Sequence, residues 1–143
     1  MSEKDDFDLQ YFLPYMLNQA AEESSIAFQR HYKNRYGMLR TEWRVLFHLG
    51  RYGEMTAKEI GERARIHKTK VSRAVQKLAD RRFLTRKKDE NDRRSERLEL
   101  TQAGLAAYRD LRGVAQEYDA KLVSGFDPED VATLRRLLTR LAG

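Results

Sequence analysis

Two adjacent arginines, Arg93 and Arg94, stand in the charged stretch KKDENDRRSERLELTQAG at residues 87–104. Arginine binds phosphate through a planar cation, and it also enters narrow minor grooves of A·T-rich DNA. Asp92 is close enough in sequence to pair with the Arg94 guanidinium and fix its orientation. The apolar residues that follow alternate, as in a β-strand. The stretch therefore predicts a two-stranded projection that carries cations to a polyanion; the alternative is a mobile hairpin with solvated charges.

A second group of phosphate-binding side chains precedes this projection. The spacing of Val71, Ala74, Val75 and Leu78 predicts a helix from about His67 to Asp80, with these residues on its inner face. Hydroxyl, amide and cationic groups that can contact phosphates and base edges occupy the outer face, which has no acid before Asp80. The alternative is an ordinary amphipathic helix with a solvated face. The outer-face residues are Lys68, Thr69, Lys70, Ser72, Arg73, Gln76 and Lys77.

A short helix is predicted just before this one. Thr56 and Glu59 have the spacing of a capping box, which opens a helix that runs to about Ala64. Gly61 lacks a side chain, so the following helix can approach it closely, and Ile66 lies in the turn between the two. Two helices joined by a tight turn in this way form a helix-turn-helix.

Two strands are predicted after the second helix, at residues 83–88 and 96–101, because both segments alternate apolar and polar residues. A β-ribbon that directly follows a helix-turn-helix makes a winged helix, and its tip lies over the neighbouring minor groove. The candidate DNA-binding residues of the ribbon are Asp92, Arg93 and Arg94 at the tip and the phosphate-binding cations Arg86 and Lys87 on the first strand.

A long N-terminal helix is predicted from about Asp8 to Tyr36, because apolar residues recur there at helical spacing. Pro14 predicts a kink or a start, and Gly37 predicts the C-terminal stop. The helix is apolar over more than one face, so we expect a second packing partner from another subunit.

Three further helices are predicted around the winged helix. Thr41 should cap one that ends near Tyr52, Thr101 should cap a long one, and Asp127 with Pro128 should begin the last.

Charge is distributed unevenly along the 143 residues, which have a net charge of +6. Residues 56–97 hold fifteen Lys or Arg against seven Asp or Glu, so this segment alone has a net charge of +8. Such clustering is typical of a polyanion-binding protein, and a lysine-rich solvated surface is the alternative. The length predicts one domain. The acidic N-terminus without a signal-peptide core, the lack of long apolar runs and the absence of cysteine lead us to expect a cytoplasmic protein.

These motifs resemble the MarR (multiple antibiotic resistance) family of winged-helix transcription regulators. The stretch DENDRRSERLELTQAG, residues 89–104, is similar to the family's wing signature, and KTKVSRAVQKLADRRFLTR, residues 68–86, is similar to its recognition helix and first strand. Two positions depart from the usual pattern: Phe83 stands where the family has glycine, and Arg65 stands where many helix-turn-helix turns have glycine.

The resemblance implies a fold that is mainly α with a small β-ribbon. It implies a single MarR-type domain over residues 1–143, with dimerisation helices at about 1–36 and 102–143 and a winged helix-turn-helix lobe at about 41–101. It further implies a homodimer on a pseudo-palindromic operator in double-stranded DNA, and it favours repression, with release by a small-molecule effector.

Aromatic and neighbouring residues could line a site for an aromatic effector between the dimerisation helices and the DNA-binding lobe. An aromatic stripe at helical spacing more often belongs to the core or to a dimer interface than to a ligand site. The absence of cysteine excludes sensing by thiol oxidation. The candidate pocket residues are Tyr11, Tyr15, His31, Tyr32, Tyr36, Met38, Trp43 and His48.

Other functional classes fit the sequence less well. No HExxH, GxSxG, Walker or dinucleotide motif is present, and the three histidines are scattered, so we expect no enzyme activity, cofactor or metal site. RNA binding fits less well because the basic segment has no aromatic side chains placed to stack on bases. The open alternative is a winged-helix protein-interaction module that does not bind an operator.

Overall fold

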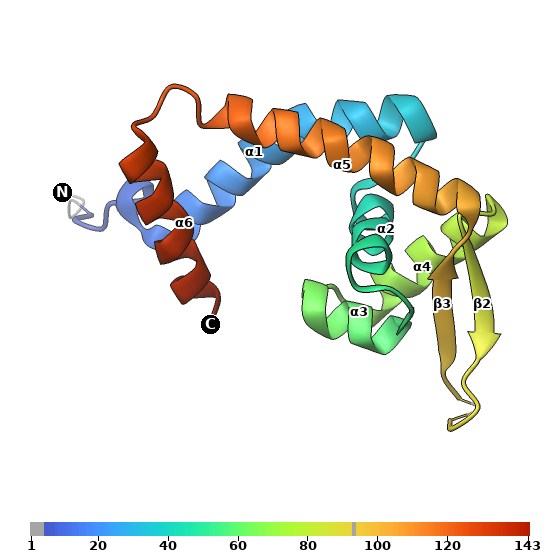
Figure 1. Cartoon of the computed structure of the whole chain (residues 1–143). Coiled ribbons are helices and arrows are strands. Elements are labelled where there is room, and N and C mark those ends of the chain that lie inside the picture. Colours follow the sequence, from blue (N-terminus) through green and yellow to red (C-terminus); the bar gives the residue numbers. More distant parts are fainter. Residues whose placement is uncertain (1–4, 93) are drawn as a thin grey trace.

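A computed structural model describes residues 5–92 and 94–143, in which a helical arm joins a lobe that carries a small sheet (Figure 1). The prediction of a mainly α fold with a small β-ribbon is confirmed. The arm contains the N-terminal 3₁₀ turn at Leu9–Tyr11 and the helices α1 (Leu13–Tyr36), α5 (Gln102–Leu122) and α6 (Pro128–Ala142). The lobe contains α2 (Arg40–Tyr52), β1 (Met55–Thr56), α3 (Ala57–Ala64), α4 (Lys68–Asp80), β2 (Leu84–Lys88) and β3 (Glu96–Leu100).

Most helix ends lie where local sequence signals place them. Pro14 occupies the first turn of α1, so it marks a start rather than a kink, and Gly37 ends α1 in the left-handed conformation with φ at 63°. Thr101 caps α5 by accepting the Gly104 N–H at 3.0 Å. Asp127 likewise caps α6.

The start of α2 differs from the prediction. Thr41 lies inside this helix, and Leu39 is its N-cap residue. The buried Glu42 carboxylate accepts a hydrogen bond from the Leu39 N–H at 3.0 Å. This bond satisfies a backbone donor at the start of the helix, so α2 begins before Thr41.

The sheet has three antiparallel strands in the order β1-β3-β2. Leu84 pairs with Leu100 and Lys88 with Glu96, as expected for a β-ribbon. The strand β1, in which Met55 pairs with Leu98, is missing from the prediction because two residues are too few to show alternation.

The core fills the lobe and continues beneath α5. Leu46, Ile60, Leu78 and Leu98 bring together α2, α3, α4 and the sheet, and Leu111 adds α5. These buried side chains fix the orientation of α4, so its polar face points outward.

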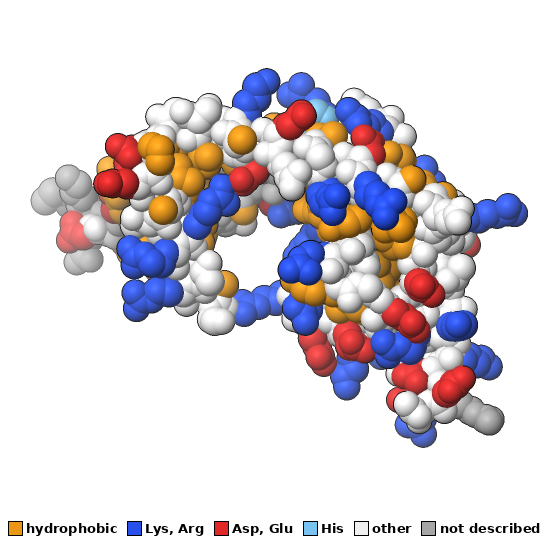
Figure 2. Space-filling model, viewed as in Figure 1, with side chains coloured by type: hydrophobic (Ala, Val, Ile, Leu, Met, Phe, Trp, Pro, Cys, Tyr) orange, Lys and Arg blue, Asp and Glu red, His pale blue; other side chains and the backbone are white. Residues whose placement is uncertain are grey.

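Apolar side chains on the arm are exposed to solvent. Of the described residues, none in α6 is buried. Figure 2 shows hydrophobic side chains gathered over α6 and the adjoining start of α1. We call this set the arm face: Leu9, Phe12, Leu13, Met16, Leu17, Leu134, Leu137, Leu138 and Leu141.

Within residues 5–92 and 94–143, none of the helices is sufficiently long and apolar to cross a membrane.

Candidate nucleic-acid interface

The turn between α3 and α4 is as tight as the sequence predicts. A Cβ atom added to Gly61 would lie 3.2 Å from the Ile66 carbonyl oxygen and 3.6 Å from the Val71 side chain, which leaves little space for any larger residue. Arg65 adopts the left-handed conformation, with φ at 57°, and ends α3 where other helix-turn-helix units use glycine. The Arg65 departure therefore changes the residue but not the backbone course.

The second departure from the family pattern, phenylalanine in place of glycine at position 83, is accommodated by the backbone of the neighbouring residue. Arg82 takes the left-handed conformation in the turn between α4 and β2, with φ at 63°. Phe83 is then free to pack its ring against Tyr36, with 6.1 Å between ring centroids. The Phe83 carbonyl accepts the Thr101 N–H at 3.1 Å, which ties the turn to the start of α5.

The helix α4 presents its polar face to solvent. Val71, Ala74, Val75 and Leu78 are buried, as predicted. The His67 ring nitrogen Nδ1 accepts the Thr69 N–H at 3.2 Å and so caps the helix. The seven side chains expected on the outer face are all exposed: Lys68, Thr69, Lys70, Ser72, Arg73, Gln76 and Lys77.

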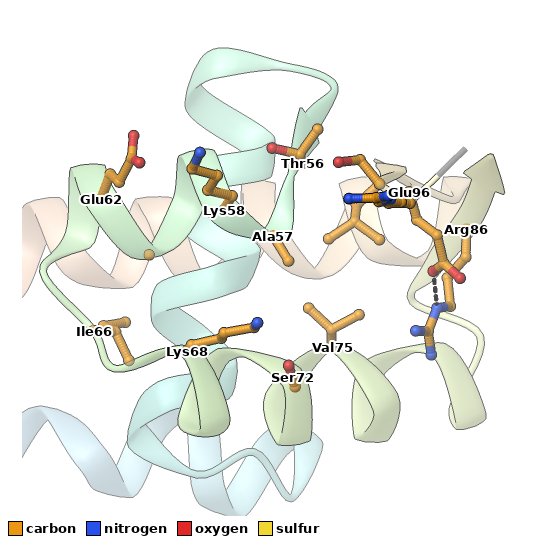
Figure 3. A pocket seen from close by; sticks show the side chains of 14 residues that line it. Thr56, Ala57, Lys58, Glu62, Ile66, Lys68, Ser72, Val75, Arg86 and Glu96 are labelled. Carbon is orange, nitrogen blue, oxygen red and sulfur yellow. Dashed lines mark hydrogen bonds and ion pairs between the residues drawn. The ribbon is translucent and has the colours of Figure 1, made fainter. Parts of the chain in front are cut away.

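A groove of about 760 Å³ lies between α3 and α4, and the wing formed by β2 and β3 borders one end of it (Figure 3). Its floor is apolar and includes Ile66, Val75 and Leu98. Lys68 and Ser72 border it from α4. The charged residues along its edges are Lys58, Lys68, Arg86 and Arg94, with Glu62 and Glu96.

One arginine joins the wing to the recognition helix. The Arg86 Nε donates to Glu96 Oε2 at 2.5 Å, and its Nη1 donates to Gln76 Oε1 at 2.7 Å. Gln76 in turn donates from Nε2 to Asp80 Oδ1 at 2.7 Å. Sequence reasoning proposed Gln76 and Arg86 as separate DNA contacts, whereas the structure brings them into direct contact.

The sequence prediction lacks Glu96 and Asp80 as partners of this bridge, although local sequence signals exist for both. Asp80 follows Gln76 by four residues, which places the two on neighbouring turns of one helix. Arg86 pairs with Leu98 across the ribbon, so Glu96 is its diagonal neighbour. The contact between Gln76 and Arg86 has no such signal, because it depends on how the wing packs against α4.

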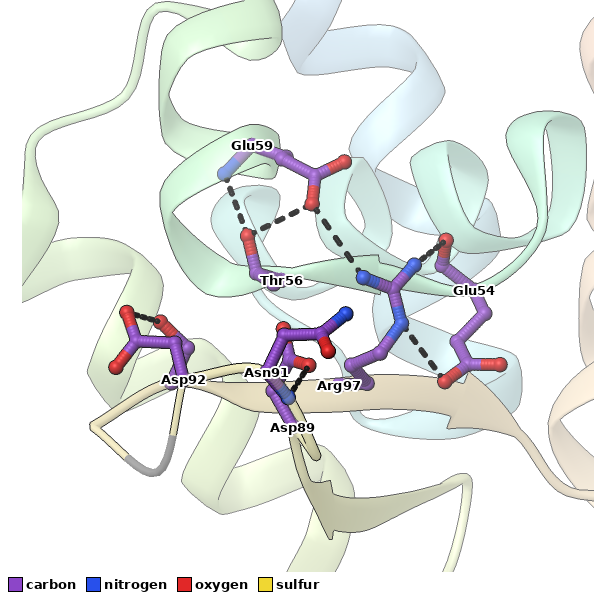
Figure 4. A network of polar contacts seen from close by, with 8 residues as sticks. Glu54, Thr56, Glu59, Asp89, Asn91, Asp92 and Arg97 are labelled. Atoms are coloured by element: carbon purple, nitrogen blue, oxygen red, sulfur yellow. Dashed lines mark hydrogen bonds and ion pairs between the residues drawn. The ribbon is translucent and has the colours of Figure 1, made fainter.

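A second arginine fixes the other strand of the wing (Figure 4). The Arg97 Nε donates to a carboxylate oxygen of Glu54 at 2.9 Å, and Nη1 lies 3.8 Å from a carboxylate oxygen of Glu59. The same Glu59 oxygen accepts a hydrogen bond from the Thr56 hydroxyl at 3.1 Å. This network connects β3 to the start of α3, the N-terminus of the helix-turn-helix.

Aspartates shape the backbone at the wing tip. Asp89 accepts the Asn91 N–H, and Asp92 accepts the Arg94 N–H, both at 3.0 Å. The expected pairing of the Asp92 carboxylate with the Arg94 guanidinium is therefore wrong: the carboxylate contacts the Arg94 backbone, because an aspartate two residues ahead is well placed to close an Asx turn. Arg94 is exposed and borders the groove. Arg93 lies outside the described residues.

The remaining basic candidates lie on different sides of the lobe. Lys87 is exposed on β2, where it pairs with Arg97. Lys77 borders a shallow depression of about 410 Å³ next to Gly37 and Leu39, on the side of α4 that faces the junction of α1 and α2.

The eight candidate effector residues do not border either of these hollows. Tyr32 and Met38 are buried in the core, and Trp43 packs 5.6 Å from Tyr32, measured between ring centroids. These three match the core alternative for the aromatic stripe. Tyr11 is exposed on the arm, and the Tyr15 hydroxyl accepts a hydrogen bond from Gln19 there.

The other three candidates are half-buried: His31 and Tyr36 lie on α1, and His48 lies on α2. His31 lies 6.1 Å from Phe28 between ring centroids, and the His48 Nδ1–H donates to the Arg44 carbonyl at 2.7 Å. The Tyr36 hydroxyl donates to Asp110 Oδ2 at 2.7 Å.

The Tyr36–Asp110 contact changes the acidity of both groups. Burial, reinforced by the hydrogen bond to Asp110, raises the pKa of Tyr36 to about 12. The hydrogen bonds from Tyr36 and Arg35 lower the pKa of Asp110. The Arg35 guanidinium lies 2.8 Å from the Asp110 carboxylate, so the three residues link the end of α1 to α5.

Both the lobe and the whole fold are similar to known proteins. Residues 36–95 match the model described as the MarR family. YwoH of Bacillus subtilis, an uncharacterized HTH-type transcriptional regulator, is 26% identical over 95 residues, which cover 66% of this chain and 69% of YwoH. The predicted resemblance to MarR-type regulators is thus confirmed.

Two solved structures share the fold at 19% identity. A mutant of MarR from E. coli, complexed with operator DNA, has a TM-score of 0.85 and covers 98% of this chain and 100% of its own. BpsR of Bordetella bronchiseptica, whose DNA binding is regulated by 6-hydroxynicotinic acid, has a TM-score of 0.86 and covers 96% of this chain and 98% of its own. The likeness confirms a winged helix-turn-helix flanked by N- and C-terminal helices.

Proposed function

We propose that this chain, whose residues 36–95 match the MarR family, binds double-stranded operator DNA as a cytoplasmic homodimeric regulator. The observation that carries this proposal is the groove that α3, α4 and the wing border together. Lys68 and Ser72 border it from the recognition helix, and Arg94 borders it from the wing. The two DNA-contacting parts of the lobe therefore open onto one basic surface.

The polar face of α4 suits the major groove. In helix-turn-helix proteins the N-terminal residues of the recognition helix contact base edges, which here are Thr69, Lys70, Ser72 and Arg73. Lys77 and Lys87 contribute phosphate contacts, and Arg94 enters the neighbouring minor groove.

The arm face supports the homodimer. Leu134 and Leu137 of α6 are 51% and 45% exposed, and Leu13 of α1 is 58% exposed. Large apolar side chains exposed in this number are costly in water unless another surface covers them. A second copy with the same arm would place two lobes on one pseudo-palindromic site.

Repression and an effector complete the proposal. A dimer that spans two half-sites excludes other proteins from the same DNA, so we favour repression. Regulation of BpsR by 6-hydroxynicotinic acid supports a small aromatic effector for this chain as well. The half-buried candidates that remain besides the core residue Trp43 are Tyr15, His31, Tyr36 and His48.

The test is competition binding between the gene's own upstream duplex and random duplex over a series of salt concentrations. If the dimer makes about 6–10 phosphate contacts, affinity should fall about 10³–10⁵-fold between about 50 and 200 mM salt. A preference for the upstream duplex is also expected. Equal, salt-independent affinities would overturn the proposal in favour of a protein-interaction module.

A further inference from the structure

The contacts of Arg86 span the two DNA-facing elements. Its guanidinium uses Nε on Glu96 of the wing and Nη1 on Gln76 of the recognition helix, at 2.5 and 2.7 Å. The Glu96 carboxylate also compensates the positive charge of Arg86. The Arg86 and Glu96 side chains are 38% and 42% exposed, respectively. A phosphate would have to compete with Glu96 for this cation.

Gln76 is held from both ends. Its amide oxygen accepts from Arg86, and its amide nitrogen donates to Asp80 at 2.7 Å. Because a carboxylate only accepts and a guanidinium only donates, these partners allow one orientation of the amide. The bridge therefore fixes the side chain of Gln76 as well as the position of β2.

We propose that Arg86 is a positioning residue that sets the spacing between wing and recognition helix, rather than a phosphate contact. The inference rests on the proposed function, since the spacing matters for an operator that α4 and Arg94 contact together. Arg97 holds β3 to Glu54 at the other side of the wing. Arg86 is thus the side chain that connects β2 to α4 through Gln76.

Substitutions that keep or remove the charge separate the two roles. In Arg86→Lys the cation stays, but a single ammonium group cannot reproduce the planar fork that reaches both Glu96 and Gln76. A positioning role predicts that Arg86→Lys and Arg86→Ala each weaken operator binding about tenfold, as for a lost charged hydrogen bond. The slope of log K against log salt should stay at the parent value in both.

Lys87→Ala is the matched control, because Lys87 is the next residue on β2 and is also exposed. Loss of one phosphate contact should change that slope by about 0.9. If Arg86→Lys binds as the parent does and Arg86→Ala changes the slope like Lys87→Ala, then Arg86 contacts phosphate and the proposal is overturned.

A double substitution tests whether the effect passes through the wing. If Arg86 positions the wing, Arg94→Ala should cost several-fold less affinity in the Arg86→Ala background than in the parent. Independent, additive losses would contradict the proposal.

Hydrogen exchange of the free protein tests the bridge without DNA. Amides of β2 and β3 should exchange faster in Arg86→Ala than in Lys87→Ala, and equal rates would show that the bridge holds nothing in place. If the parent fails to bind any duplex, the proposed function fails on its own, while the exchange rates still decide whether Arg86 positions the wing.

Discussion

The carboxylate of Asp92 accepts a hydrogen bond from the backbone N–H of Arg94, with 3.0 Å between Oδ1 and N. Its other oxygen accepts from the Ser95 hydroxyl at 3.4 Å, and the Asp92 carbonyl accepts the Ser95 N–H at 3.0 Å. Asp92 therefore controls Arg94 through the course of the backbone and not through its charge.

Replacing Asp92 separates these two influences. Asp92→Ala and Asp92→Asn remove the same negative charge, but asparagine keeps a side-chain oxygen that can close the turn. We expect Asp92→Ala to lose several-fold affinity for the operator relative to Asp92→Asn, while both bind random duplex equally. Competition binding on the two duplexes measures this. Identical operator affinities would show that the turn does not matter for binding.

The sequence predicts those parts of the site that depend on local spacing. The buried stripe of α4 and the caps at Thr56 and Thr101 follow from residues within one or two turns. Packing between distant elements decides the rest. Whether Arg86 contacts Gln76 depends on the angle of the wing, and whether Tyr32 lines a pocket or the core depends on which helices cover it.

The N-cap of α2 is a second feature that the sequence does not predict correctly. Thr41 is a good N-cap residue by type, yet Glu42 reaches back to the Leu39 N–H and starts the helix earlier. Both residues satisfy a local rule, so local rules alone do not choose between them.

Two glycines of α5 should respond oppositely to alanine. At Gly104 a Cβ would lie 2.0 Å from the Phe83 carbonyl oxygen, and this backbone atom is held by the Thr101 N–H. We expect Gly104→Ala to destabilise the fold by about 1–3 kcal/mol. At Gly113 nothing lies within 4 Å, so alanine should stabilise the helix by about 0.5–1 kcal/mol. Urea unfolding measures both; a stable Gly104→Ala variant would refute the close approach to Phe83.

Stability at the extremes of pH should depend on the pair formed by Tyr36 and Asp110. The Tyr36 pKa is raised to about 12, so its contribution is complete below the ordinary tyrosine value of about 10 and is lost as the pH rises from 10 to 12. The Asp110 pKa is lowered, so its contribution is present above about pH 4 and is lost as the pH falls through the folded value.

Unfolding free energies measured across pH would check both directions. Tyr36→Phe should reduce the loss of stability between pH 10 and about 12, and Asp110→Asn should reduce the loss below about pH 4. Profiles parallel to the parent in both variants would show that the hydrogen bond between these residues does not contribute.

The arm face should control assembly. Changing Leu137 and Leu138 together to glutamate places two charges in the proposed interface, so we expect loss of the dimer or of the fold, seen by ultracentrifugation. Leu39→Gln is the control, because Leu39 is similarly exposed, at 47%, but belongs to the lobe. A parent protein that sediments as a folded species of one chain mass, 16.8 kDa, at micromolar concentration would contradict the dimer.

Arg73 provides the sharpest test of base recognition. Its side chain is exposed on the second turn of α4, whereas Val71 and Ala74 beside it are buried. An arginine at this place can donate two hydrogen bonds to guanine O6 and N7 in the major groove. Arg73→Ala should then cost about 1–3 kcal/mol of binding free energy on the operator and much less on random duplex.

Arg73→Lys keeps the charge but loses the paired donors, so it should resemble alanine on the operator and the parent on random duplex. Both variants are measured by competition on the two duplexes at one salt concentration. If lysine restores operator binding, Arg73 contacts a phosphate, and the base-reading role passes to Thr69, Lys70 or Ser72.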